Sequence, residues 1–248
     1  MLFKDKVALV TGASKGLGRT IASHLAEVGV RGIAFDKSEV FDELPENWLS
    51  FSGDVTDEQS LVEAASLVES EFGRLDIVVA NAGLVPPWRE TENIDLDEWR
   101  QVFEVNVSGI IATIKQTVPL LKKRGGAIVV MGSLNSHRAH PQQCLYTASK
   151  HAVLGITRAT AMDLGRYGIR VNALGPGPIA TEALVGRVQS RAEQGGLPEG
   201  EAFEQLSAGG ALQRLATEDE VAKLTVFLAS ENSSGMTGQL VPIDAGYL

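Results

Sequence analysis

The sequence predicts an α/β fold in which a doubly wound parallel β-sheet carries helices on both faces. Three observations favour it. Short apolar runs alternate with helical segments along the chain, which is the pattern of right-handed βαβ crossovers. A glycine-rich turn directly follows the first apolar run, and polar side chains follow several later ones. No internal repeat or linker interrupts the pattern, so we expect a single domain over residues 1–248.

Composition and charge narrow the class of protein. The chain has 248 residues, 44% hydrophobic and 21% charged, as expected for a globular domain. The net charge of −9 and the lack of a Lys/Arg run argue against nucleic acid and membrane as partners. Cys144 is the only cysteine, the charged N-terminus does not resemble a signal peptide, and no apolar run approaches the ~20 residues of a membrane span. We therefore expect a cytoplasmic protein.

A glycine-rich turn links the first predicted strand, 7–10, to a helix over 19–28. Its spacing is G-x-x-x-G-x-G rather than the G-x-G-x-x-G of the usual dinucleotide fingerprint. Glycines let the backbone approach a pyrophosphate, and the helix N-terminus offers free N–H groups. The turn therefore predicts a nucleotide site that involves Gly12, Ser14, Lys15, Gly16, Leu17 and Gly18.

The second predicted strand, 32–35, ends at Asp36. A carboxylate about 20 positions after the glycine turn can accept a hydrogen bond from the adenosine ribose 2′-OH. The same carboxylate would repel a 2′-phosphate. Asp36 therefore favours NAD as cofactor. Lys15 and Lys37 could instead meet a 2′-phosphate, which keeps NADP open as the less favoured cofactor.

The next elements continue the alternation. A strand is predicted over 49–55, and Asp57 opens a helix that runs to Phe72. Asp54 could accept a hydrogen bond from the adenine amino group or act as a turn residue. The fourth strand, 75–80, is followed by Asn81-Ala82-Gly83. Because ligands bind beyond the carboxyl ends of parallel strands, these polar strand ends favour one shared site.

A long helix is predicted over 97–123, and Pro119 should kink or end it. Asn106 lies inside this helix among apolar neighbours. An asparagine there needs partners for its amide. Asn106 therefore either has a structural role or holds a water molecule that the active site needs.

The pair Tyr146 and Lys150 carries the predicted chemistry. A helix over 143–166 places them one turn apart on one face. A nearby ammonium lowers the pKa of a phenol from its usual value of about 10. Such a tyrosine can exchange a proton with a hydroxyl or carbonyl oxygen. Ser133 follows the fifth strand, 127–132, and could converge with Tyr146 on one substrate oxygen.

The last third of the chain adds a strand over 170–174 and a rigid turn over 175–181. Residues 182–215 are rich in glycine and charge, and we interpret them as mobile helices that form a lid over the site; a solvated insertion is the alternative. A helix over 218–230, capped by Thr217, and a strand over 240–244 complete the fold.

Taken together, these segments resemble the short-chain dehydrogenase/reductase family over essentially the whole chain. The resemblance implies a Rossmann-type fold, NAD(P)-dependent interconversion of an alcohol and a carbonyl, and a homo-oligomer, as a homotetramer or homodimer. Ala80 departs from the family pattern, where an asparagine is more usual, and this affects only strand-end packing. The matching pieces are Thr11-Gly12-x-x-x-Gly16-x-Gly18, Asn81-Ala82-Gly83, Asn106, Ser133, Tyr146-x-x-x-Lys150 and Pro176-Gly177.

The resemblance also implies roles for these residues. Tyr146 is expected to be the general acid/base, and Lys150 to lower its pKa and bond the nicotinamide ribose. Ser133 would orient the substrate oxygen, and Asn106 would hold a water in a proton relay. The expected cofactor contacts are Gly12, Ser14, Lys15, Gly16, Leu17, Gly18, Asp36, Asp54, Val55, Asn81, Ala82, Gly83, Tyr146, Lys150, Pro176, Gly177, Ile179 and Thr181.

The loop between Ser133 and Tyr146 shapes the substrate pocket in this family. Its candidate substrate contacts are Asn135, His137, Gln142 and Cys144. Their polar character hints at a sugar or polyol.

Other residues suggest chemistry less strongly. His137, His140 and Cys144 match no common zinc pattern, so we expect no metal site. Arg187 and Arg191, one turn apart in the lid, could meet an anionic substrate, but a solvated helix face is the preferred interpretation.

The leading hypothesis is an oxidoreductase that transfers a hydride between NAD(H) and a secondary alcohol or carbonyl substrate. An NADPH-dependent carbonyl reductase of the 3-oxoacyl type is an alternative that Lys15 keeps open. A catalytically silent nucleotide-binding scaffold is the alternative from another class. It would be favoured by an incomplete tetrad, whereas Asn106, Ser133, Tyr146 and Lys150 are all present.

Overall fold

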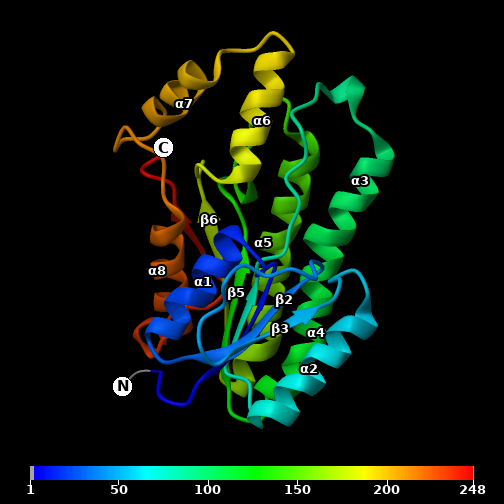
Figure 1. Ribbon diagram of the computed structural model, residues 1–248, viewed down its shortest axis with the longest axis vertical. Coiled ribbons are helices and arrows are strands. Elements are labelled where there is room, and N and C mark those ends of the chain that lie inside the picture. The colour runs from blue at the N-terminus through cyan, green and yellow to red at the C-terminus, as the bar shows by residue number, and fades with distance from the viewer. Residues whose placement is uncertain (1–2, 248) are drawn as a thin grey trace.

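A single seven-stranded sheet organises the computed structural model, which describes residues 3–247 (Figure 1). All strand pairs are parallel, in the order β3-β2-β1-β4-β5-β6-β7. This confirms the predicted doubly wound sheet. The strands are β1 Val7–Thr11, β2 Arg31–Asp36, β3 Trp48–Ser52, β4 Ile77–Ala80, β5 Gly126–Met131, β6 Ile169–Pro176 and β7 Leu240–Ile243.

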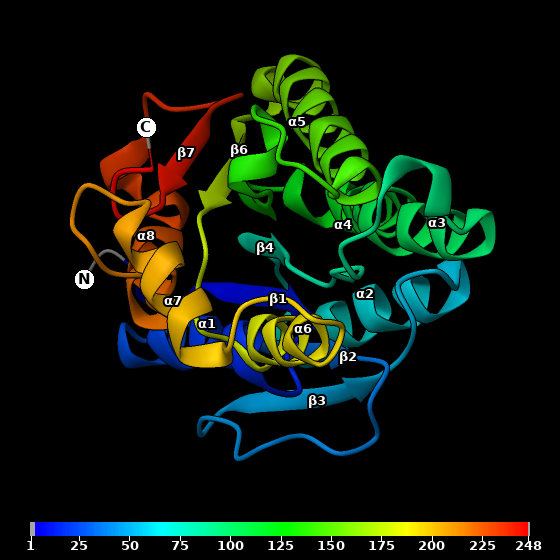
Figure 2. The ribbon, with the colours of Figure 1, turned by 90° about the horizontal axis from the view of Figure 1, so that it is seen from above.

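Helices cover both faces of this sheet (Figures 1 and 2). Helices α1 (Gly16–Glu27) and α8 (Glu218–Ala229) pack on one face, and α2 (Glu58–Phe72), α4 (Gly109–Leu121) and α5 (Cys144–Leu164) pack on the other. Each central strand is therefore buried on both sides: Leu9 belongs to one apolar cluster and Val10 to the other. This explains why the strands read as continuous apolar runs. Short 3₁₀ turns occur at Thr91–Asn93, Leu134–Ser136, Gly165–Tyr167 and Glu231–Ser233.

The long helix predicted over 97–123 is divided into three parts. Helix α3 spans Leu96–Phe103, a π-helical segment follows at Glu104–Ser108, and α4 then runs to Leu121. The interruption therefore lies at Asn106, and Pro119 stays inside the last turn of α4. Asn106 hydrogen-bonds backbone groups outside the helix, and π segments of this kind are frequent at functional sites.

The third strand is shorter than predicted, because it ends at Ser52 rather than at residue 55. Asp54 turns the chain instead: its carboxylate accepts hydrogen bonds from the Thr56 backbone N–H at 2.9 Å and from the Thr56 hydroxyl at 2.8 Å. Asp57 then caps α2, as predicted, by accepting from two N–H groups of its first turn.

The carboxyl ends of the strands meet at one edge of the sheet. Helices α6 (Glu182–Glu193) and α7 (Glu199–Ala208) lie over this edge, in the segment predicted to form a lid (Figure 2). Within residues 3–247, no helix combines the length and apolar character that crossing a bilayer would require.

Candidate active site

A large cleft of about 840 Å³ opens at the carboxyl edge of the sheet. Every residue predicted to contact the cofactor lines it, from Gly12 in the first turn to Thr181 before α6. The strand ends and the segment just before α6 thus form one continuous side of the cleft, as expected of a ligand site in an open parallel sheet.

The backbone of the glycine turn has the conformation that a close approach to a phosphate requires. Gly12 and Gly16 adopt positive φ angles of 67° and 55°. A Cβ added to Gly18 would lie 2.0 Å from the Gly12 carbonyl oxygen, so turn and helix pack too closely for a side chain. Lys15 at the start of α1 provides no side-chain cap, and the first turn holds no acidic residue. The first N–H groups of α1 are therefore free to bind an anion.

Asn81 braces the glycine turn from the end of β4. Its side-chain amide donates to the carbonyls of Thr11 and Gly12 at 3.0 and 3.1 Å. In return, the Thr11 hydroxyl accepts from the backbone N–H groups of Asn81 and Ala82, both at 3.1 Å. These four bonds fix the strand ends of β1 and β4 against each other. This side of the cleft is therefore held in place by hydrogen bonds between the two strand ends.

Asp36 is held in place at the end of β2. Its two carboxylate oxygens accept from the backbone N–H groups of Ser14 at 3.0 Å and Ser38 at 3.1 Å. Asp36 lines the cleft. Of the two lysines that could meet a 2′-phosphate, Lys15 is paired with Glu182, the first residue of α6, at 2.8 Å.

Tyr146 and Lys150 lie in the first two turns of α5, and both line the cleft. Lys150 is 4% exposed, its Nζ donates to the Met131 carbonyl at 2.8 Å, and it lies 5.7 Å from the Tyr146 ring centroid. Burial lowers the pKa of Lys150 to about 8. The ammonium is therefore enclosed beside the phenol, at the end of β5.

Burial also raises the pKa of Tyr146, and hydrogen bonding to Ser133 and the positive charge of Arg187 oppose this effect. The net direction is opposite to the one that the spacing of Tyr146 and Lys150 predicts. Enclosure of the phenol outweighs its neighbours because a phenolate loses more hydration on burial than a phenol does. Ser133, 8% exposed after β5, lines the same part of the cleft.

Asn106 lies behind this site and is fully buried. Its Oδ1 accepts from the Leu84 N–H at 2.7 Å, and its Nδ2 donates to the Leu84 carbonyl at 2.8 Å and to the Ser149 hydroxyl at 3.4 Å. Ser149 in turn donates to the Tyr146 carbonyl at 2.8 Å. Asn106 therefore joins the segment after β4 to the helix that carries Tyr146, which gives its amide a structural function.

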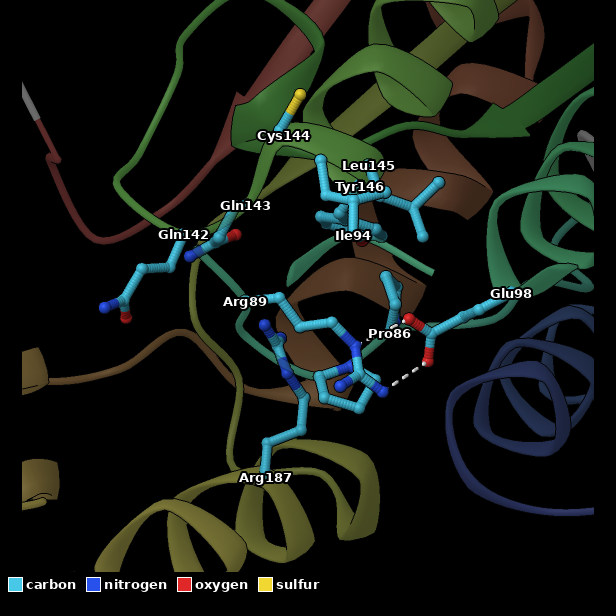
Figure 3. A pocket seen from close by; sticks show the side chains of 11 residues that line it. Pro86, Arg89, Ile94, Glu98, Gln142, Gln143, Cys144, Leu145, Tyr146 and Arg187 are labelled. Carbon is cyan, nitrogen blue, oxygen red and sulfur yellow. Dashed lines mark hydrogen bonds and ion pairs between the residues drawn. The ribbon is translucent and has the colours of Figure 1, made fainter. Parts of the chain in front are cut away.

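The four candidate substrate contacts lie in different places. Asn135 lines the cleft, where its amide donates to Gln143 and Thr147 at 3.0 and 2.9 Å. His137 is not among the residues that line the cleft. Gln142 and Cys144 border a small adjoining cavity of about 10 Å³ instead. Figure 3 shows the Cys144 sulfur and the Gln142 amide pointing away from the middle of that cavity.

Three further side chains line the cleft near Tyr146: Trp88, His140 and Arg187. The Arg187 guanidinium lies 4.3 Å from the Trp88 ring centroid. Burial lowers the pKa of Arg187 to about 10 and also lowers the pKa of His140. The interpretation of Arg187 as part of a solvated helix face is wrong, because its Nε and Nη2 atoms are buried. Its only signal in the sequence was the pair of arginines one turn apart.

No metal centre emerges from the described part of the chain. Across residues 3–247, no three His, Cys, Asp or Glu side chains gather as metal ligands would.

Comparison with known proteins gives consistent matches over the whole chain. The family described as "enoyl-(acyl carrier protein) reductase" matches residues 12–248. An uncharacterized oxidoreductase of Thermotoga maritima is 36% identical, over 99% of this chain and 98% of that protein. The trans-4-hydroxycyclohexanecarboxylate dehydrogenase of Sinomonas cyclohexanicum is 34% identical, over 98% and 92%. The structure of an NAD⁺-bound xylitol dehydrogenase superimposes with a TM-score of 0.92 at 27% identity, over 99% and 100%.

Proposed function

Because the chain belongs to the short-chain dehydrogenase/reductase family, whose members are NAD(P)-dependent oxidoreductases of alcohol and carbonyl groups, we propose that it prefers NAD and interconverts a small secondary alcohol and its ketone. One observation carries the proposal. The cleft joins a glycine turn and Asp36 at one end to Ser133, Tyr146 and a buried Lys150 at the other.

When bound, the nicotinamide supplies the redox chemistry by accepting the hydride of the alcohol or returning one to the ketone. The protein supplies the proton transfer. In the oxidation direction, the Tyr146 phenolate takes the hydroxyl proton while Ser133 holds the same oxygen. In the reduction direction, the Tyr146 phenol returns that proton to the carbonyl oxygen. The Lys150 ammonium stabilises the phenolate by its charge, since it is enclosed beside the ring.

The preference for NAD rests on Asp36. Its carboxylate is fixed by two backbone N–H groups and would meet a ribose 2′-hydroxyl as an acceptor. A 2′-phosphate at the same place would bring two negative charges together. Lys15, the main argument for NADP, already has a partner in Glu182.

The alternatives predict different outcomes. A 3-oxoacyl-type reductase would favour NADPH, and the family description that names an acyl carrier protein keeps this candidate in view. A silent scaffold would bind the nucleotide without turnover. The cytoplasmic location and the homotetramer or homodimer expected from the sequence stay predictions.

The test compares kcat/KM for NAD and NADP over a panel of secondary alcohols, polyols and hydroxy acids, followed by absorbance of the reduced nicotinamide. We expect NAD to be favoured, and Asp36→Ala to reduce the preference about tenfold or more, because an acceptor for the ribose is lost and a repulsion removed. A wild-type enzyme that prefers NADP would contradict the cofactor proposal. Nucleotide binding with no turnover of any alcohol or ketone would favour the scaffold.

A further inference from the structure

Arg187 presents an unusual cation at the substrate end of the cleft. Its Nε and Nη2 atoms are buried, and neither has a hydrogen-bond partner among residues 3–247. No carboxylate of the described chain forms an ion pair with it. Buried donor atoms of a cation are unfavourable when they are unpaired, so they normally have a partner or bind one.

Two unsatisfied atoms define one edge of the guanidinium. Nε–H and Nη2–H point in parallel, which is the geometry that matches the two oxygens of a carboxylate. The same edge binds carboxylates elsewhere in this protein. Arg74 donates to both Asp76 oxygens through these atoms at 2.8 and 2.6 Å, and Arg89 donates to both Glu98 oxygens at 2.9 and 3.4 Å.

Trp88 fixes this edge in the cleft. The guanidinium lies 4.3 Å from the indole centroid, so its cationic face is used by the ring and its N–H edge is left for another ligand. Arg187 lines both the cleft and the small cavity beside it. Figure 3 shows the side chain extending from α6 toward that small cavity, with Pro86 and Arg89 beside it and residues of α5 on the other side. Burial raises the pKa of Tyr146, and the positive charge of Arg187 is close enough to the phenol to oppose this rise.

We propose that Arg187 binds a carboxylate of the substrate, so that the enzyme acts on a small hydroxy acid or the matching keto acid. This inference rests on the proposed function and adds the substrate class. Ser133 and Tyr146 would hold the reacting oxygen at one end of the molecule, and Arg187 the carboxylate at the other.

The test uses hydroxy acids whose hydroxyl lies two to five carbons from the carboxylate, each compared with its own primary amide. The readout is the ratio of kcat/KM for acid and amide with NAD. We expect the wild-type enzyme to favour the acid. Arg187→Met should lower the ratio about 30-fold or more, as expected when a charge-assisted pair is lost. Arg187→Lys, which keeps the charge but not the parallel N–H edge, should lose part of it.

Arg191→Gln is the matched control. Arg191 lies one turn further along α6, also near Trp88 at 5.6 Å, but it is exposed and donates to Gln142. Its removal should leave the ratio unchanged. The charge of Arg187 also acts on Tyr146, so loss of that charge should slow the turnover of acid and amide alike. The ratio of kcat/KM for acid and amide removes this shared effect.

Three results would overturn the inference: amides turned over as well as acids by the wild-type enzyme, an equal loss for acid and amide in Arg187→Met, or the same fall in ratio in Arg191→Gln. If no substrate at all is turned over, the proposed function fails separately. Calorimetric titration of the same acids and amides into the NADH-bound protein then tests the carboxylate site. Equal affinity for acid and amide there would overturn it.

Discussion

The two ends of the cleft are built in different ways. At the nucleotide end, Asn81, Thr11 and Asp36 are each fixed by at least two hydrogen bonds to the backbone. At the substrate end, the buried Nε and Nη2 atoms of Arg187 have no partner in residues 3–247. The two ends meet through an exposed pair, Lys15 of the glycine turn and Glu182 of α6. The polar side chains of the nucleotide end thus have partners within the protein, whereas the buried donors of Arg187 are left for a bound ligand.

The largest effect on nucleotide binding is expected when a glycine is replaced by alanine at the nucleotide end, with the same replacement in α6 as its control. A Cβ at Gly18 would lie 2.0 Å from the Gly12 carbonyl oxygen and 2.7 Å from Asn81 Nδ2. Gly18→Ala should therefore displace the turn and weaken NAD binding about 10²-fold, since misplacements of this kind are costly. Titration of NADH by fluorescence measures it.

Gly186 in α6 is the control, because a Cβ there would meet nothing within 4 Å. Gly186→Ala should leave the dissociation constant of NADH unchanged and favour the helix by about 0.5–1 kcal/mol. Equal losses in the two variants would show that the ends do not differ in rigidity.

A second prediction concerns what supports the nucleotide end. Asp76 is 2% exposed at the other end of β4, and it accepts from the Val7 N–H at 3.0 Å, from Lys6 at 3.2 Å and from Arg74. Asp76→Asn should lower the free energy of unfolding by about 2–4 kcal/mol at pH 7, because it leaves buried donors poorly paired. Urea unfolding measures this loss.

The same variant has a pH signature. Burial would raise the pKa of Asp76, but hydrogen bonds from Arg74 and Val7 and the charge of Lys6 together hold it below its ordinary value of 3.8. The stabilisation is therefore present above about pH 4 and is lost as the pH falls through the pKa of the folded state. The difference in unfolding free energy between wild type and Asp76→Asn should shrink below pH 4. A difference that stays constant to pH 2 would show that ionisation of Asp76 is not its source.

The smallest effect is expected at the exposed contact between the two ends. Both partners of the Lys15–Glu182 pair are well exposed, and such pairs contribute little. Glu182→Gln should change the dissociation constant of NADH less than twofold and leave the thermal midpoint in place. A large loss of nucleotide affinity would mean that the lid, rather than the glycine turn, sets binding.

The contrast also explains what the sequence could predict. The glycine turn, Asp36, Asn81 and the Tyr146–Lys150 pair are local patterns, and the rule that parallel strands share one carboxyl edge brings them together. Asn106 was recognised as an unusual residue, but the π-helical segment around it depends on its bonds to Leu84, which is distant in sequence.

The sequence indicates Arg187 as a possible contact for an anion but not its burial, because that burial depends on packing between α6 and Trp88, which no local pattern encodes. The pKa direction of Tyr146 was missed for the same reason. Spacing identifies the neighbouring charge of Lys150, whereas enclosure by the rest of the fold sets the larger, opposing effect. Contacts made by the backbone near strand ends were thus predictable, and contacts made by long side chains across the cleft were not.

The most direct test of the account is single-turnover hydride transfer by Tyr146→Phe, with NADH binding measured on the same preparation. We expect a rate about 10²–10⁴-fold below wild type, with the dissociation constant of NADH changed less than threefold. We also expect oxidation by the wild-type enzyme to speed up as the pH rises, since burial keeps the Tyr146 pKa high, and the variant to lose this dependence. Near-normal transfer by the variant, or an unchanged pH profile, would contradict the assignment of Tyr146 as the acid/base.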